Sequence, residues 1–364
     1  MDFESEPEMG HAPPWPFDTF TLSDGRSFQL ADSVARSRCL DGHSLYTSRA
    51  SLGSDSVVVK WCWSKTRMHA VRIIETAVSS AKARGDLWIV DHLPHIIWYE
   101  ERRVSHQEYE REHGGSRTLQ LLVEEELRPL TELTDAEELG HAFLGIFRCC
   151  RWLYERCRLM HRNINLCNLM YRRIDGKVHG VLAGFDLAVV LNEHSYEPHS
   201  ENPLAFVACD LVDPSPLFPV DQYLYRFDLE SLFYALALAI CHYEHGMLIP
   251  PEKQPFKCWH RLEPTRLFPE KICFFFDSLR RWKPTPQFSS LYWLVVYLRA
   301  LFKHGLSARD DFRYRKEAET GVASDDGFDG DTLGGHVTFD AFEAVFLTRL
   351  PPSKSEYGRA SAEP

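Results

Sequence analysis

The segment from Met160 to Val190 constrains the fold of this chain more than any other part of the sequence. It begins with the letters HRN at residues 161–163, and Asn168 follows five residues after this triplet. Two partly apolar runs come next, separated by the turn sequence DG at residues 175–176, which is a strong hairpin signal. The letters GFD at residues 184–186 follow the second run. The sequence therefore predicts two polar loops joined by a β-hairpin.

This pattern resembles the catalytic loop and the metal-binding loop of protein kinases, and it is most similar to the fungal-type protein kinase family. In kinases an Asp after His-Arg accepts the substrate hydroxyl proton, an Asn five residues later binds one Mg²⁺, and an Asp opening the next loop holds the other metal site. The resemblance places His161, Arg162 and Asn163 in the catalytic loop, with Asn168 at the metal-binding Asn. Asn163 and Gly184 stand where the two carboxylates are expected, so both carboxylates are missing.

Composition and charge limit which partners this protein can bind and in which cellular compartment it is expected. A net charge of -11 with a pI near 5.9 argues against the concentrated positive surface that nucleic acid or anionic membrane requires. The longest apolar run, residues 232–241, is about half a membrane span, and the acidic start lacks the layout of a signal peptide. The ten cysteines form no C-x-x-C pair, which favours reduced, buried thiols, Cys167 among them. We therefore expect a soluble cytoplasmic or nuclear protein that binds neither nucleic acid nor membrane.

The first third of the chain contains the elements of a nucleotide-binding small lobe. The β-branched and aromatic run at residues 56–63 predicts a strand. The resemblance assigns the phosphate-pairing lysine of that strand to Lys60, and a solvent-facing lysine is the equal alternative. A kinase also carries a glycine-rich turn upstream, whose backbone closes over the phosphates. Only Gly42 remains of those glycines, which predicts weakened nucleotide binding.

Apolar residues at helical spacing predict a helix over residues 66–84. By the resemblance this helix carries the Glu that pairs with the strand lysine, but the chain has Ala70 at that place. Glu75 lies five residues further on, about 140° around the helix, so we expect it to point elsewhere.

Beyond these elements the chain follows the order of a kinase large lobe. Residues 118–123 predict a buried strand that leads into a hinge at residues 124–127. The letters TDAE at residues 134–137 predict a capping box with Thr134 as the cap, and a long amphipathic helix follows. Residues 201–208 take the place where a peptide substrate docks in the family.

The sequence RFDLESLFY at residues 226–234 closely resembles a family motif on a buried helix. The resemblance gives Asp228 the structural role of holding the backbone of the catalytic loop. Residues 331–339 resemble the closing segment of the family.

Together these features predict an α+β chain with a bilobal protein-kinase-like fold, a small β-rich lobe before a larger, mainly helical one. The expected boundaries are a flexible lead-in at residues 1–20, the small lobe at 21–126, the large lobe at 127–348 and a flexible tail at 349–364.

The leading hypothesis for function is a pseudokinase, a protein-kinase-like module that binds an unidentified protein partner and has a degraded site for ATP and Mg²⁺. The alternative is a divergent Ser/Thr kinase or small-molecule phosphotransferase that uses Lys60, Asn168 and Asp186, with Gly42 and Gly184 lining the cofactor. In that alternative Asp186 joins Asn168 as a metal ligand. A third hypothesis is a recently inactivated paralogue with no selected role.

Overall fold

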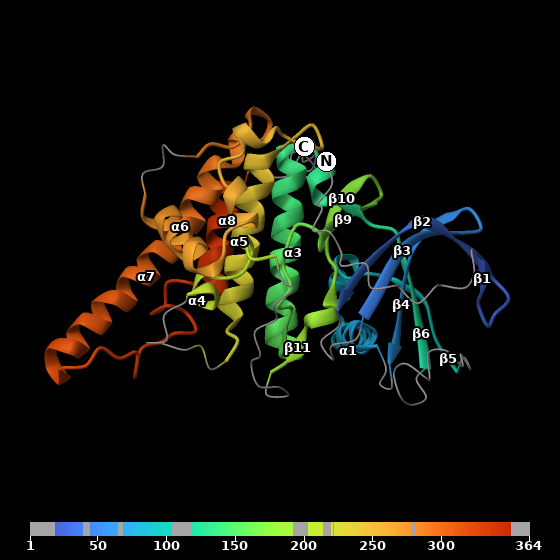
Figure 1. Ribbon diagram of the computed structural model, residues 1–364, viewed down its shortest axis with the longest axis horizontal. Helices are drawn as coiled ribbons and strands as arrows, with labels where there is room; N and C mark the ends of the chain where they lie inside the picture. The colour runs from blue at the N-terminus through green and yellow to red at the C-terminus, as the bar shows by residue number, and fades with distance from the viewer. Residues whose placement is uncertain are drawn as a thin grey trace, which may run out of the picture. The chain divides into compact units, whose positions relative to one another are not determined.

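The computed structural model describes residues 19–38, 44–64, 68–103, 118–191, 203–213, 220, 222–277 and 282–350 (Figure 1). Two compact units make up the chain, one formed by residues Met1–Ile73 with His95–Glu126 and the other by Ile74–Pro94 with Leu127–Pro364. Gly42 and nearly all of the expected lead-in and tail lie outside the described residues.

The first unit is built on an antiparallel sheet, whose six described strands follow the order β1-β2-β3-β4-β6-β5 (Figure 1). The strands are β1 (Thr19–Thr21), β2 (Ser27–Arg38), β3 (Ser44–Leu52), β4 (Asp55–Ser64), β5 (Ile96–Arg103) and β6 (Thr118–Glu125). The strand expected at residues 56–63 is therefore confirmed as part of β4.

Successive side chains of β4 point to opposite faces of the sheet, so they pack in two different apolar clusters. Val57 and Val59 are fully buried on one face. Cys62 lies on the other face, where it packs with Met68 and with Val71 of helix α1 (His69–Arg84). This alternation explains why a strand that reads as almost continuously apolar is stable here, since both of its faces are covered.

The second unit is mainly helical. Its helices after α1 are α3 (Ala136–Cys157), α4 (Cys209–Val212), α5 (Tyr225–His242), α6 (Pro264–Phe276), α7 (Tyr292–Thr320) and α8 (Phe339–Arg349), with 3-10 turns η1 (Leu87–His92), η2 (Leu130–Glu132), η3 (Phe185–Leu187), η4 (Pro251–Lys253), η5 (Lys257–His260) and η6 (Pro286–Leu291). Its strands are β7 (Arg128–Pro129), β8 (Leu159–Met160), β9 (Leu169–Ile174), β10 (Lys177–Leu182), β11 (Val189–Val190), β12 (Tyr243–Glu244) and β13 (Met247–Leu248).

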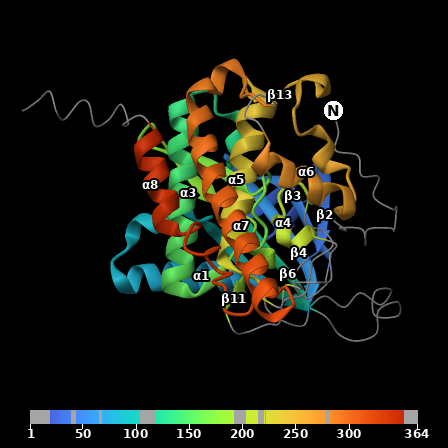
Figure 2. The same cartoon turned by 90° about the vertical axis from the view of Figure 1, so that its left-hand side faces the viewer.

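Helix α5 is the centre of this unit, because every one of its residues is buried. It lies among α3, α6 and α7 in both views (Figures 1 and 2). A helix that is apolar on every side is stable only when other elements surround it, so the burial predicted for this helix is confirmed. The α+β, bilobal organisation expected from the sequence is also confirmed.

Three local predictions are wrong. The cap of α3 is Asp135, whose carboxylate accepts from the backbone N–H groups of Glu137 and Glu138, so Thr134 is not the cap. The strand expected at residues 118–123 ends too early, because β6 continues through Glu125. Finally, Cys167 is exposed rather than buried.

Among the residues described, no helix is both long and apolar enough to cross a membrane.

Candidate functional site

Two strand pairings bring the two polar loops of the second unit together. Strand β8 ends just before residue 161 and pairs with β11, which begins just after residue 188. Strand β9 begins just after Asn168 and pairs with β10 through the turn at residues 175–176. Residues 161–168 and 183–188 are therefore tied side by side at both ends, and the hairpin predicted from the turn sequence is confirmed.

His161 connects the two loops directly. Its Nε2–H donates to the carbonyl oxygen of Ala183 (2.9 Å), and its Nδ1 accepts from the backbone N–H of Asn163 (3.3 Å). Its ring also packs edge-on against Phe185, with 4.9 Å between ring centres. Burial lowers the pKa of His161 to about 4, so the imidazole is neutral near pH 7 and holds a single tautomer. This histidine is a structural link rather than an acid or base.

Asp228 anchors the first loop to helix α5. Its carboxylate accepts from the backbone N–H groups of His161 (2.8 Å) and Arg162 (2.9 Å), and from the Tyr223 hydroxyl (2.9 Å). Arg162 has a left-handed backbone, with φ of 64°, which is costly for a residue with a side chain. Burial raises the pKa of Asp228, and the three donors oppose that shift. Asp228 thus lies where the sequence placed it and holds a strained turn.

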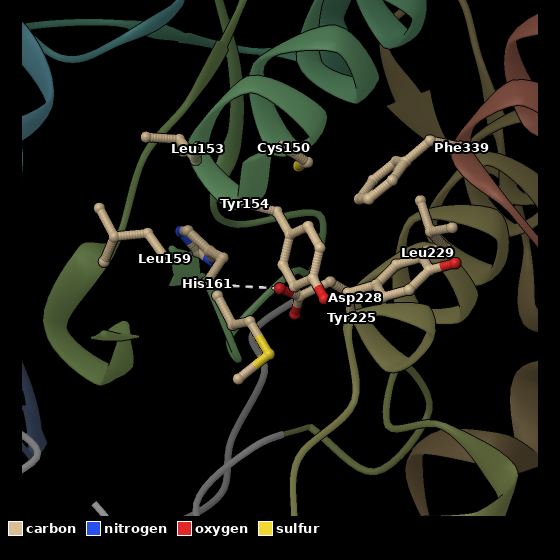
Figure 3. A pocket seen from close by; sticks show the side chains of 10 residues that line it. Cys150, Leu153, Tyr154, Leu159, His161, Tyr225, Asp228, Leu229 and Phe339 are labelled. Carbon is tan, nitrogen blue, oxygen red and sulfur yellow. Dashed lines mark hydrogen bonds between the residues drawn. The ribbon is translucent and has the colours of Figure 1, made fainter. Parts of the chain in front are cut away.

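A small cavity adjoins this anchor (Figure 3). Asp228 and His161 line it together with Tyr225 from α5, Cys150 from α3 and Phe339 from α8. Its volume of about 10 Å³ has room for roughly one water molecule. The cavity is a packing defect behind the loop, too small for a nucleotide.

Amide side chains fill the place where a kinase would have its catalytic carboxylate. Asn165 donates from Nδ2 to the side-chain oxygen of Asn163 (2.9 Å), and Asn168 donates from Nδ2 to the backbone oxygen of Asn163 (2.8 Å). These neutral groups fix the loop through hydrogen bonds. A neutral amide cannot take up the proton of an attacking hydroxyl, so Asn163 lacks the chemistry of a general base.

Gly184 stands in a crowded, left-handed turn, with φ of 77°. A Cβ atom added there would lie 2.3 Å from both Cγ and Oδ1 of Asn168. The position therefore accommodates a side chain only if Asn168 moves, and glycine itself offers no metal ligand.

The described residues fit a metal ion poorly. In the described part of the chain, no group of three or more His, Cys, Asp or Glu side chains is arranged so that it could hold a metal ion. Asp186 is the acidic residue closest to Gly184 in sequence, and its Oδ1 is buried with no hydrogen-bond partner among the described residues. That oxygen is one unsatisfied acceptor, which falls short of a complete ligand set for Mg²⁺.

In the first unit, Lys60 forms an ion pair with Glu124 of β6, with 2.8 Å between Nζ and Oε2. Its side chain is only 13% exposed, so the alternative of a solvent-facing lysine is wrong. Ala70 is buried at the start of α1, and Glu75 is exposed, as expected from its angle on the helix.

Sequence reasoning missed a buried charged cluster that holds residues 203–212 in the second unit. Asp210 is bound by the guanidinium groups of Arg226 (2.5 Å) and Arg309 (2.6 Å), which keep its pKa well below the usual range. Glu230 accepts from the backbone N–H of Cys209 (2.7 Å). The charged letters inside the apolar motif at residues 226–234 were the signal, since a charge on a fully buried helix needs a partner.

Lys271 completes this cluster from helix α6. It is fully buried, and its ammonium donates to the carbonyl oxygens of Leu204 (2.9 Å) and Val207. The ammonium also lies 4.3 Å from the ring centre of Tyr234. Burial lowers the pKa of Lys271 to about 7. No local sequence pattern indicates this contact, because it depends on how α6 packs.

The match to a known protein family agrees with this geometry. Residues 89–241 match the fungal protein kinase family. Among solved structures, vaccinia related kinase 3 is similar, with a TM-score of 0.46 and 17% sequence identity over 78% of this chain and 83% of that one. No curated protein matches the sequence. The matched stretch contains both loops and Asp228, so the predicted resemblance is confirmed: over residues 89–241 this chain is similar to fungal protein kinases, and its fold is protein-kinase-like.

Proposed function

We propose that this protein is a pseudokinase, a kinase-like module that acts by binding another protein and does not transfer phosphate. The proposal is supported most by one observation: the catalytic-type loops are fully assembled, yet they hold Asn163 and Gly184 where the chemistry needs carboxylates. His161 and Asp228 fix the loops through bonds that require neither carboxylate.

The two replacements affect different steps of phosphoryl transfer. Asn163 cannot accept a proton, and Gly184 cannot hold a metal ion that neutralises phosphate charge. Losing one such group lowers the rate by about 10²-fold or more, and the losses do not simply add. ATP and Mg²⁺ are therefore not assigned as working cofactors of this protein.

A protein partner is the class that fits the remaining features. The charge of -11 is unsuited to nucleic acid or to anionic membrane. The buried cluster around Asp210 and Lys271 holds residues 203–212 in place, and this stretch overlaps residues 201–208, which by the resemblance take the place where a kinase docks peptide. A pre-ordered backbone lowers the entropy cost of binding a partner. We place this activity in the cytoplasm or nucleus, because the cysteines of the described residues are free thiols, which are typical of those reducing compartments.

The test is a phosphotransfer assay with radiolabelled ATP, a generic protein substrate, and Mg²⁺ or Mn²⁺. We expect no transfer by the natural protein, by Asn163→Asp or by Gly184→Asp, because each single change leaves the other defect in place. If any variant transfers phosphate, we expect it to be the one that carries both Asn163→Asp and Gly184→Asp. Robust transfer by the natural protein, abolished by Lys60→Met, would refute the proposal.

A divergent kinase or small-molecule phosphotransferase is the second candidate. The unpartnered Oδ1 of Asp186 favours it, since a buried acceptor two residues after Gly184 is suited to a cation. This candidate requires that any activity of the natural protein be lost in Asp186→Asn and retained in Asp175→Asn, a change in the distant hairpin turn.

A further inference from the structure

The outward side of helix α7 carries apolar side chains, where a surface helix normally carries charged ones. Trp293 and Tyr297 are 55% and 40% exposed, and they lie one turn apart on the same side of the helix. This side continues through Ala300 and Leu301, which are half-buried, to the exposed His304. The buried residues of the helix lie on its other side. We call these five residues the α7 face; the helix that carries them crosses the front of the helical unit in Figure 2, beside α8.

The exposed rings of the α7 face form one contiguous surface. The ring centres of Trp293 and Tyr297 are 6.3 Å apart. Arg349, the last residue of α8, places its guanidinium carbon 3.6 Å from the centre of the Tyr297 ring. Single exposed apolar residues are ordinary, whereas contiguous apolar patches mark interaction sites. Trp, Tyr and Arg are also the residues that contribute most of the binding energy at protein interfaces, so the α7 face has the composition of an interface.

The charged side chains that the structure describes beside the α7 face are basic. Residues 278–309 contain no Asp or Glu, although the whole chain has a net charge of -11. Lys303 precedes His304 on α7, and neither Lys303 nor Arg349 forms a salt bridge with any residue that the structure describes. Both acidic residues of α8 are instead paired with Arg151 of α3. The α7 face therefore combines apolar rings with cations that lack a carboxylate partner in the described part of the chain.

A partner of this face needs acidic groups beside an apolar surface. A second copy of the chain does not supply them, because a two-fold interface brings the same residues of both copies together, and the charged ones here are cations. An anionic membrane is repelled by the net charge of -11. The apolar residues follow α7 for about three turns, or roughly 16 Å, so a helix with one apolar side has the complementary shape.

We infer that the α7 face is a docking surface for an acidic amphipathic helix of another protein. The apolar side of that helix packs on Trp293 and Tyr297, and its flanking Asp and Glu side chains pair with Lys303 and Arg349. This inference rests on the proposed pseudokinase function and deepens it, because it names a surface for the protein partner and the chemistry of that partner. The surface does not include residues 203–212.

The experiment selects peptides that bind the full chain from a display library. Each library member is a helix-forming peptide of about 20 residues with Leu along one side, and its flanking positions are drawn from Glu, Gln and Lys. We expect the selected peptides to be enriched in Glu, because Lys303 and Arg349 attract carboxylates. Fluorescence anisotropy then measures the affinity of the selected peptides for two variants. Tyr297→Ala should weaken binding at least about tenfold. Tyr314→Ala is the matched control and should leave the affinity unchanged, because it removes an exposed tyrosine of the same helix from outside the α7 face.

A further variant, Arg349→Glu, covers the case in which Tyr297→Ala does not fold. Selection on this variant should shift the flanking positions from Glu toward Lys, because the charge beside the face is reversed. No enrichment of Glu on the natural protein, equal affinities of the two tyrosine variants, or an unchanged preference in Arg349→Glu would overturn the inference. A dimer of the natural protein in sedimentation, or its binding to phosphatidylserine vesicles, would also overturn it if Tyr297→Ala abolished that behaviour. The proposed function is judged separately, by phosphotransfer in the natural protein.

Discussion

Replacing Gly184 with alanine tests whether the second loop has room for a side chain. Two effects contribute to the loss of stability in this variant: the strain of a side chain on a left-handed backbone, and the crowding against Asn168. A control is needed to measure them separately. Gly176, in the hairpin turn, provides the control, because it has the same φ of 77° and a Cβ atom there would meet nothing within 4 Å. Both substitutions also reduce the freedom of the unfolded chain to the same extent.

The magnitudes follow from the contacts. A side chain in the left-handed region costs about 1–2 kcal/mol at either glycine. At Gly184 the new Cβ atom would lie 2.3 Å from Cγ of Asn168, so that side chain has to rotate away. It would then lose its hydrogen bond to the Asn163 carbonyl (2.8 Å), which is worth roughly 0.5–1.5 kcal/mol. Gly184→Ala should therefore cost about 0.5–1.5 kcal/mol more than Gly176→Ala.

Urea denaturation followed by tryptophan fluorescence measures the difference, which should appear in the midpoint and not in the slope. The same comparison is then repeated with Asn168→Ala, which removes the three Asn168 atoms that lie nearest to the added Cβ atom. In that background the penalty of Gly184→Ala should fall to that of Gly176→Ala. Equal costs for the two glycines in the natural background would refute the crowding argument.

Three further predictions concern the anchors of the second unit. Asp228→Ala leaves two buried amides unpaired and should destabilise the protein by about 2–6 kcal/mol, against about 0.5–1.5 kcal/mol for Tyr223→Phe, and equal losses in urea would contradict it. Because the pKa of His161 is near 6.5 in the unfolded chain and about 4 in the folded one, this residue should lower stability as the pH falls from 6.5 to 4, by at most about 1.4 kcal/mol per pH unit. The difference in stability between the natural protein and His161→Gln should therefore change over that window, and a constant difference would contradict the shift. Lys271→Met should speed hydrogen exchange across residues 203–212, which the lysine holds by two carbonyls, and unchanged exchange would exclude that anchoring role.

The sequence was sufficient for the features that depend on local chemistry. The turn at residues 175–176 and the apolar character of α5 predicted their elements because turn type and burial are determined by the residues themselves. The amide contacts of Asp228 were expected from the resemblance of its motif to one of the fungal protein kinase family.

Features that depend on where an element ends, or on tertiary packing, could not be predicted. Alternation along β6 does not reveal its last residue, so Glu124 was taken for a hinge residue and its ion pair with Lys60 was not foreseen. Thr134 and Asp135 are both capable caps, and only the backbone geometry selects Asp135. The contacts of Lys271 require α6 to lie against residues 203–212, which no local pattern encodes.

The contacts that fold the site do not depend on the carboxylates that a kinase needs for catalysis. The two positions that lack a carboxylate, Asn163 and Gly184, differ in how easily one could be restored. Asn163 forms bonds that hold its loop, and an Asp would fit in the same volume. Gly184 is different, because Asn168 occupies the space that a side chain would need. Asn168 is also the residue that a kinase uses to bind metal, so it cannot simply be removed. Regaining a metal site therefore requires both a new residue at position 184 and a rotation of the Asn168 side chain away from it, whereas regaining a base at Asn163 requires only one substitution. We conclude that position 184 is the stronger barrier to catalysis in this fold.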